Sequence, residues 1–135
     1  EMPRTRFVAE FIGNNNLFDG ILTSISGSIA LIEHGDSMFY VNVSDDHLHH
    51  TVGSSVSLSV RADCVVTGTN SDMANRIDAT YVATEYLGSL ETDVFEFAPN
   101  HYVHVEQHRA SKNRTYQVGE TETLCWSAVS AVLLD

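Results

Sequence analysis

The sequence predicts an all-β fold, a barrel or a sandwich of short antiparallel strands. Val, Ile and Thr supply 32 of the 135 residues, and these β-branched side chains favour strands. Apolar residues recur with a period of two along most of the chain. Turn residues, glycine among them, separate the apolar runs. Many short strands at this spacing are typical of barrels and sandwiches rather than of βαβ folds.

Ten strands are expected from the alternation. Two turns, Ser26-Gly27-Ser28 and His34-Gly35-Asp36, have the composition of hairpin connections. The predicted strands cover residues 19–25, 28–33, 37–43, 55–61, 64–67, 76–86, 92–97, 102–107, 122–126 and 129–134. The aromatic residues on strand positions are expected in the core; they are Tyr86, Phe95, Phe97 and Trp126.

Residues 1–16 are predicted to be a linker that carries one short amphipathic helix. Its apolar face is formed by Phe7, Val8, Phe11 and Ile12. Pro3 suits a first helical turn, and Gly13 suits the C-terminal end. Because the chain opens on such a helix, we expect residue 1 to follow an earlier domain, against which this helix would pack. Residues 17–135 are then the β-domain.

The β-domain is expected to be a duplication of two halves, about residues 17–68 and 75–135. A polar segment, residues 68–72, separates them. One pattern recurs at an offset of 66 residues: Val52-Gly53, Leu58, Val60, Ala62 and Val66 return as Val118-Gly119, Leu124, Trp126, Ala128 and Val132. Each half alone is too thin to bury its apolar face, so the two are expected to share one core.

Charge and motifs exclude several functions. Seven basic residues stand against 18 acidic ones, a net charge of −11, which disfavours nucleic acid and anionic membrane surfaces as partners. The apolar runs are far shorter than the roughly 20 residues that cross a bilayer. Lys112 is the only lysine, and no glycine-rich loop precedes it, which excludes a P-loop. The carboxylates look like scattered surface acids, such as Glu120 and Glu122. We therefore expect no catalytic and no cofactor-binding residues.

The histidines and cysteines indicate no definite metal site. His47, His49 and His50 are expected in an exposed polar loop, with zinc binding as the open alternative. His101, His104 and His108 fall on an alternating strand that separates them, and His104 is expected in solvent. The two cysteines, Cys64 and Cys125, are expected to be reduced and buried, as in a cytosolic protein, with a pairing of the two left open.

Several motifs follow one another along the chain. The junction Pro3-Arg4-Thr5-Arg6-Phe7-Val8-Ala9-Glu10-Phe11-Ile12-Gly13 is followed by Asn16-Leu17-Phe18-Asp19-Gly20. Further along come Leu58-Ser59-Val60-Arg61-Ala62-Asp63, Tyr86-Leu87-Gly88 and Leu124-Cys125-Trp126. In this order the motifs resemble the C-terminal regulatory part of ABC-importer ATP-binding subunits, and Leu124-Cys125-Trp126 is similar to the form found in spermidine/putrescine (polyamine) importers. In the segment that begins at Leu58, Ala62 and Asp63 replace the proline and glutamate of the family.

The resemblance implies a tandem OB-type β-domain, named TOBE, that regulates the importer and contacts a second copy in a homodimer. It implies further partners in a missing N-terminal ATPase domain, which would bind ATP and Mg, and in membrane permease subunits. It implies a place in the cytoplasm, peripheral to the inner face of the membrane. The alternative is a domain that senses a small ligand, either substrate or anion, in an importer for ferric iron, sugar or another solute.

Overall fold

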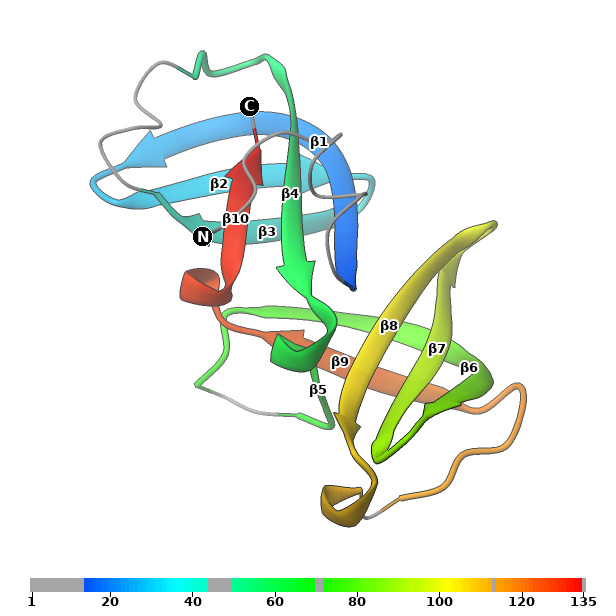
Figure 1. The fold of residues 1–135 in the computed structure, drawn as a ribbon. Coiled ribbons are helices and arrows are strands. Elements are labelled where there is room, and N and C mark those ends of the chain that lie inside the picture. Colours follow the sequence, from blue (N-terminus) through cyan, green and yellow to red (C-terminus); the bar gives the residue numbers. More distant parts are fainter. Residues whose placement is uncertain (1–13, 44–49, 70–71, 113, 135) are drawn as a thin grey trace.

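The computed structural model describes residues 14–43, 50–69, 72–112 and 114–134, which form two five-stranded antiparallel sheets. Figure 1 shows the sheets as two lobes. The strands are β1 (Asn15–Ser26), β2 (Ile29–His34), β3 (Ser37–Asn42), β4 (Ser55–Arg61), β5 (Val66–Thr67), β6 (Asn75–Leu87), β7 (Leu90–Ala98), β8 (His101–His108), β9 (Thr121–Trp126) and β10 (Ala131–Leu134). Short 3-10 turns are η2 (Ala62–Cys64), η3 (Arg109–Ser111) and η4 (Ala128–Ser130). The predicted all-β, tandem OB-type fold is confirmed.

The two lobes exchange their last strands. Lobe 1 has the strand order β10-β4-β1-β2-β3, and lobe 2 has the order β5-β9-β6-β7-β8. β5 follows β4 in the chain but pairs with β9, and β10 follows β9 but pairs with β4. Figure 1 shows the red β10 beside the green β4 in lobe 1. Each of the expected halves, 17–68 and 75–135, therefore supplies the final strand of the other lobe's sheet.

Two hairpins begin lobe 1, as the turn residues predicted. Ser26 pairs with Ile29, and His34 pairs with Ser37, so that each turn contains two residues. The first residue of each turn is glycine, with φ of 61° at Gly27 and 58° at Gly35. Glycine adopts this left-handed conformation without steric cost, and such turns match the twist of the strands they join.

The passages between lobes correct two strand predictions. The predicted strands 64–67 and 129–134 began too early, because Ala62–Cys64 and Ala128–Ser130 form the 3-10 turns η2 and η4. These turns lie 66 residues apart, the same offset as the sequence repeat. Each redirects the chain from one sheet to the other, which a continuous strand would not do. The predicted helix over residues 6–12 lies outside the described residues, and β1 begins at Asn15 rather than at residue 19.

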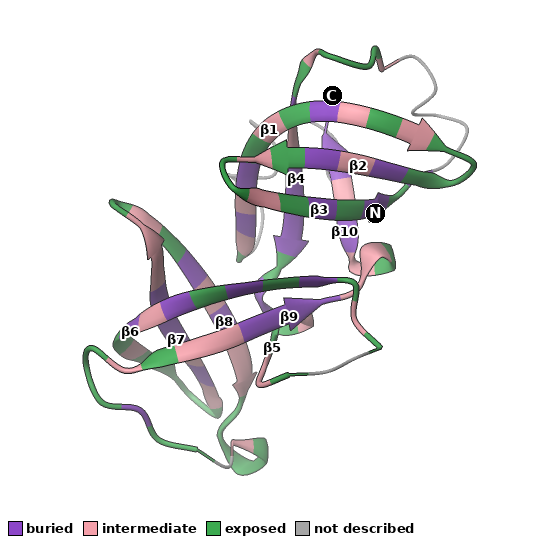
Figure 2. Ribbon diagram, turned by 180° about the vertical axis from the view of Figure 1, so that it is seen from behind, coloured by how far each residue is buried: buried purple, intermediate pink, exposed green. Residues whose placement is uncertain are grey.

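The core is continuous between the lobes and is aromatic at their junction. Trp126 of β9 stacks on Phe18 of β1, with ring centroids 5.3 Å apart, and it also contacts Phe39 of β3. All three side chains are fully buried. Figure 2 shows buried residues alternating with more exposed ones along the strands. Tyr86 is an exception to the predicted aromatic core: it is 65% exposed near the end of β6, where the side chain of Arg109 covers its ring.

Two buried asparagines join the lobes reciprocally. The side chain of Asn16 donates to the backbone carbonyl of His104 at 2.9 Å and accepts from the same residue's N–H at 2.7 Å. Asn75 binds the backbone of Tyr40 in the same way, at 2.9 and 2.7 Å. Tyr40 and His104 lie on β3 and β8, the edge strands of the two sheets. Each lobe thus satisfies backbone groups on the other's exposed edge.

Both cysteines are free in this structure. Cys125 is buried, and its thiol donates to the backbone carbonyl of Gly68 at 3.1 Å. Cys64 is half-buried, less than predicted. Burial raises the pKa of the Cys64 thiol, and the charge of Asp63 acts in the same direction. Within the described ranges, no helix has the length and apolar character needed to cross a membrane.

Candidate functional site

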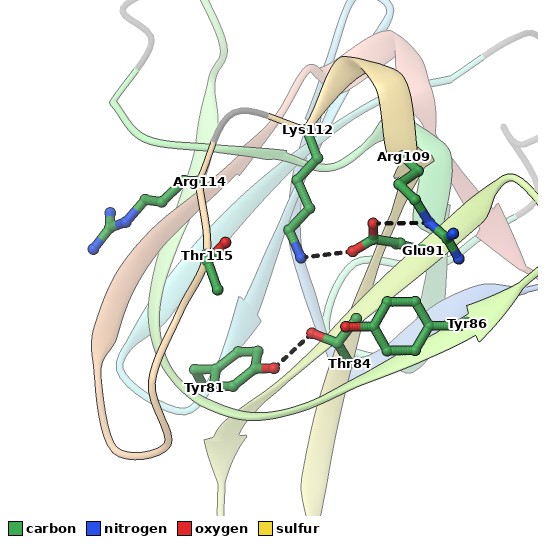
Figure 3. A pocket seen from close by; sticks show the side chains of 8 residues that line it. All are labelled: Tyr81, Thr84, Tyr86, Glu91, Arg109, Lys112, Arg114 and Thr115. Carbon is green, nitrogen blue, oxygen red and sulfur yellow. Dashed lines mark hydrogen bonds and ion pairs between the residues drawn. The ribbon is translucent and has the colours of Figure 1, made fainter.

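The outer end of lobe 2 contains an open cavity of about 430 Å³ with an unusual concentration of charge. β6 supplies Tyr81, Thr84 and Tyr86, β7 supplies Glu91, and the connection from β8 to β9 supplies Arg109, Lys112, Arg114 and Thr115. Figure 3 shows the Lys112 side chain reaching down between Glu91 and the β6 side chains. Three of the five cationic side chains that the structure describes lie in this one connection.

A bulge in β6 places two hydroxyls on the same side of the strand. The register with β7 shifts between Tyr81 and Ala83. Side chains of a regular strand alternate between its faces, so Tyr81 and Thr84 would point to opposite sides without the extra residue. With the bulge, the Tyr81 hydroxyl lies 2.5 Å from Thr84 Oγ1. Thr84 Oγ1 in turn donates to Asp93 Oδ1 at 2.6 Å, and Asp93 is the residue of β7 that pairs with Thr84.

Lys112 is held between two buried carboxylates. Its ammonium donates to Asp93 Oδ1 at 2.8 Å and to Glu91 Oε1 at 3.0 Å. The side chains of Lys112, Glu91 and Asp93 are only 11%, 9% and 1% exposed. Burial lowers the pKa of Lys112, but the hydrogen bonds and charges of Asp93 and Glu91 outweigh it and leave the pKa raised. The ammonium is therefore charged at neutral pH.

The two arginines at the rim also have carboxylate partners and aromatic contacts. Arg109 Nε lies 3.3 Å from Glu91 Oε2, and its guanidinium covers the ring of Tyr86. Arg114 pairs with Glu120 and Glu122 and lies 4.5 Å from the ring centroid of Tyr116. Figure 3 shows Arg114 directed away from Lys112. The cations at the cavity are thus matched by acids, and the arrangement is suited to holding a charged group rather than to bond-breaking chemistry.

The structure settles part of what the sequence predicted for sites. His47 and His49 lie outside the described residues, and His50 lines a shallow groove beside β1 and β4. No group of three or more metal-ligating side chains gathers in the described ranges. His104 is half-buried rather than in solvent, and its backbone is hydrogen-bonded to Asn16. His101 lies in the junction cluster, 5.1 Å from Phe18 and 5.5 Å from His34 between ring centroids.

The interpretation of the carboxylates as scattered surface acids is wrong for several of them. Glu122 has an 11% exposed side chain and accepts hydrogen bonds from Arg114 and Tyr116. Glu91 and Asp93 were not singled out at all. Strand alternation carried a signal, because both acids share a face of β7 with the fully buried Phe95. An acid in register with a core aromatic indicates a buried charge, which needs a partner.

Fold and site together define a small β-domain of two five-stranded lobes with a charged cavity at the end of the second. No family model matches the chain. The chain is 25% identical over 134 residues to the spermidine/putrescine import ATP-binding protein PotA of Rubrobacter xylanophilus. The alignment covers 99% of this chain but only 35% of that relative, so the chain spans about a third of its length.

A solved structure shares the fold. The cytoplasmic molybdate-binding protein ModG, crystallised with molybdate bound, matches with a TM-score of 0.77 at 17% sequence identity. The match covers 90% of this chain and 96% of that chain. At this identity the likeness concerns the fold. The chain thus has the tandem OB-type fold.

Proposed function

We propose that the chain is the C-terminal regulatory domain of the ATP-binding subunit of an ABC importer. The observation that carries the proposal is the alignment of 99% of the chain with one third of PotA. The tandem OB fold and the ordered motifs from Asn16 to Trp126 support it. ATP and Mg would bind to a separate ATPase domain, and this domain would act through contacts.

The transported solute is proposed to be a polyamine. The name of the relative and the Leu124-Cys125-Trp126 form favour spermidine or putrescine. The partners would be a second copy of the chain, the ATPase domain and the permease subunits. The place of action would be the cytoplasm, at the inner face of the membrane.

A chimaera tests the proposal. The chain replaces the matching third of Rubrobacter xylanophilus PotA, and ATP hydrolysis and dimer formation are compared with those of PotA and of its ATPase part alone. We expect the chimaera to form the dimer and to hydrolyse ATP at a rate closer to that of PotA than to that of the ATPase part. A chimaera that behaves like the ATPase part alone would contradict the proposal. A neighbouring gene pair for permeases would support the importer, and a neighbouring polyamine-binding protein would support the solute.

A sensor of small anions is the second candidate function, favoured by the fold shared with ModG. Thermal unfolding of the chain with molybdate, sulfate, putrescine and spermidine separates the two candidates. A saturable rise in melting temperature with an oxyanion alone would favour the anion sensor. The net charge of −11 favours cations over oxyanions as ligands.

A further inference from the structure

One buried oxygen of the Lys112 cluster, behind the residues that line the lobe 2 cavity, lacks a partner among the described residues. Asp93 is 1% exposed, and its Oδ1 accepts from both Thr84 and Lys112. Its Oδ2 has no hydrogen-bond partner among the described residues. A buried carboxylate oxygen without a donor is costly, and native proteins seldom keep one without a reason. The cluster around Lys112 therefore has unused capacity to accept hydrogen bonds.

The sister lobe shows that the fold does not need this polar cluster. Both lobes have a bulge at the same place, between Leu22 and Ser24 in β1 and between Tyr81 and Ala83 in β6. The pairing registers make Leu22 equivalent to Tyr81. By the same registers, Ile25 and its partner Ala30 are equivalent to Thr84 and its partner Asp93.

Lobe 1 thus has apolar side chains at the positions equivalent to Tyr81, Thr84 and Asp93. Leu22 and Ala30 are fully buried, and Ile25 packs on the core. Replacing buried ion pairs by apolar groups is commonly neutral or stabilising. Stability alone gives no reason for lobe 2 to retain two buried acids, so the cluster points to a ligand.

The chemistry of the cluster selects a cation with N–H donors. The Lys112 ammonium donates to two carboxylates, the Thr84 hydroxyl donates to one of them, and tyrosine rings line the adjoining cavity. Carboxylates and aromatic faces both attract an ammonium group. The unpartnered atom is an acceptor, and the cations present are already paired, which argues against an anion.

We propose that this cavity binds a small organic ammonium ion, which takes the place of the Lys112 ammonium between Asp93 and Glu91. Lys112 then acts as an internal occupant that keeps the acids neutralised when the ligand is absent. The alkyl part of the ligand would lie along Tyr81 and Tyr86 in the cavity. The binding site rests on the geometry of lobe 2, whereas its use in regulating an importer rests on the proposed function.

Competition with Lys112 sets the expected affinity. A tethered group has an effective concentration in the millimolar range, so a free amine must reach comparable concentrations to replace it. Removing the internal ammonium should therefore tighten amine binding by about tenfold or more. The same change leaves Asp93 without its cation and Glu91 with Arg109 alone, which destabilises the chain until an amine is added.

Three forms of the chain test the proposal, with 1,4-diaminobutane (putrescine) as the probe. They are the unchanged chain, Lys112→Met, and the double variant Asp93→Ala with Lys112→Met, which copies the alanine of lobe 1. Thermal unfolding and calorimetry are measured at constant ionic strength. Tetramethylammonium, a cation without N–H donors, serves as the control for general charge effects.

We expect diaminobutane to stabilise Lys112→Met saturably, at about tenfold lower concentration than it stabilises the unchanged chain. The double variant should fold without the amine and show no response to it. If Lys112→Met is unfolded alone, diaminobutane should restore its folding. Absence of any effect beyond that of tetramethylammonium, or an equal effect on the double variant, would overturn the site. These results do not depend on the ATPase chimaera, so the site and the proposed function can fail separately.

Discussion

At the scale of single residues, Asn75 provides the sharpest test of how the lobes are joined. Replacing it with alanine removes both hydrogen bonds to Tyr40 and leaves a backbone N–H and C=O on β3 without these partners. We expect Asn75→Ala to lower the free energy of unfolding by about 2 kcal/mol, measured by urea denaturation. Asn42→Ala is the control. Asn42 is an exposed asparagine on β3, the strand of Tyr40, and its replacement should change stability little. Equal stabilities of the two variants would contradict the role given to Asn75.

The titration of Lys112 and Tyr116 makes the stability of the fold depend on pH in the alkaline range. The pKa of Lys112 is raised above its ordinary value of 10.5, because hydrogen bonds to Asp93 and Glu91 outweigh its burial. Burial raises the pKa of Tyr116 above 10.0, and its hydrogen bond to Glu122 adds to this. Groups with raised pKa values stabilise the fold fully below their unfolded-state values, and this stabilisation is lost as pH rises through the folded-state values.

We therefore expect the free energy of unfolding to fall as the pH rises above about 10, the ordinary range of both groups. Urea denaturation between pH 8 and pH 12 measures this. In Tyr116→Phe the fall should be shallower, because one of the groups with a raised pKa is absent and Lys112 and Cys64 remain. A variant curve parallel to that of the unchanged chain would show that the Tyr116 hydroxyl does not contribute.

At the scale of elements, the strand exchange makes the end of the chain part of lobe 1. Leu133 of β10 is 1% exposed and pairs with Leu58 of β4. We expect Leu133→Ala to cost roughly 2–5 kcal/mol through lost burial and a cavity. Hydrogen exchange should rise in β1 and β4, although these strands precede the change by more than 70 residues in sequence. Val129→Ala, at a 70% exposed position of η4, should change neither. Faster exchange confined to β9 would argue against the exchanged strand.

The strands and turns also show which features of the fold could be predicted from the sequence. The strands were predicted because each buries one face, which produces a local alternation, and the hairpins because Gly27 and Gly35 occupy positions with positive φ. The strand exchange was not predicted, because the partner of β5 or β10 is chosen by packing far away in the chain. The Lys112 cluster was missed for a similar reason. It depends on a bulge after Tyr81 and on a connection that folds back over β7, and neither has a local pattern.

At the scale of the whole molecule, charge opposes the self-association implied by the importer proposal. Two copies with a net charge of −11 each repel one another, and three of the five described cations are paired with acids at one end of lobe 2. Exposed apolar side chains could offset this repulsion on contact, and among the most exposed are Leu87 and Val118, at 79% and 78%. The balance between the two effects should therefore depend on ionic strength.

We predict that the chain forms a dimer that tightens as salt rises. The screening length falls from about 30 Å at 0.01 M to about 10 Å at 0.1 M salt, which weakens the repulsion between exposed charges while apolar contact is retained. Sedimentation velocity over a range of protein concentrations at these two salt levels measures the association. A two-fold contact would bring one surface against itself, so charge reversal at a contacting acid would act twice. A chain that stays monomeric at both salt levels would mean that dimer formation depends on the ATPase domain, and the part of this domain in the importer would be regulatory alone.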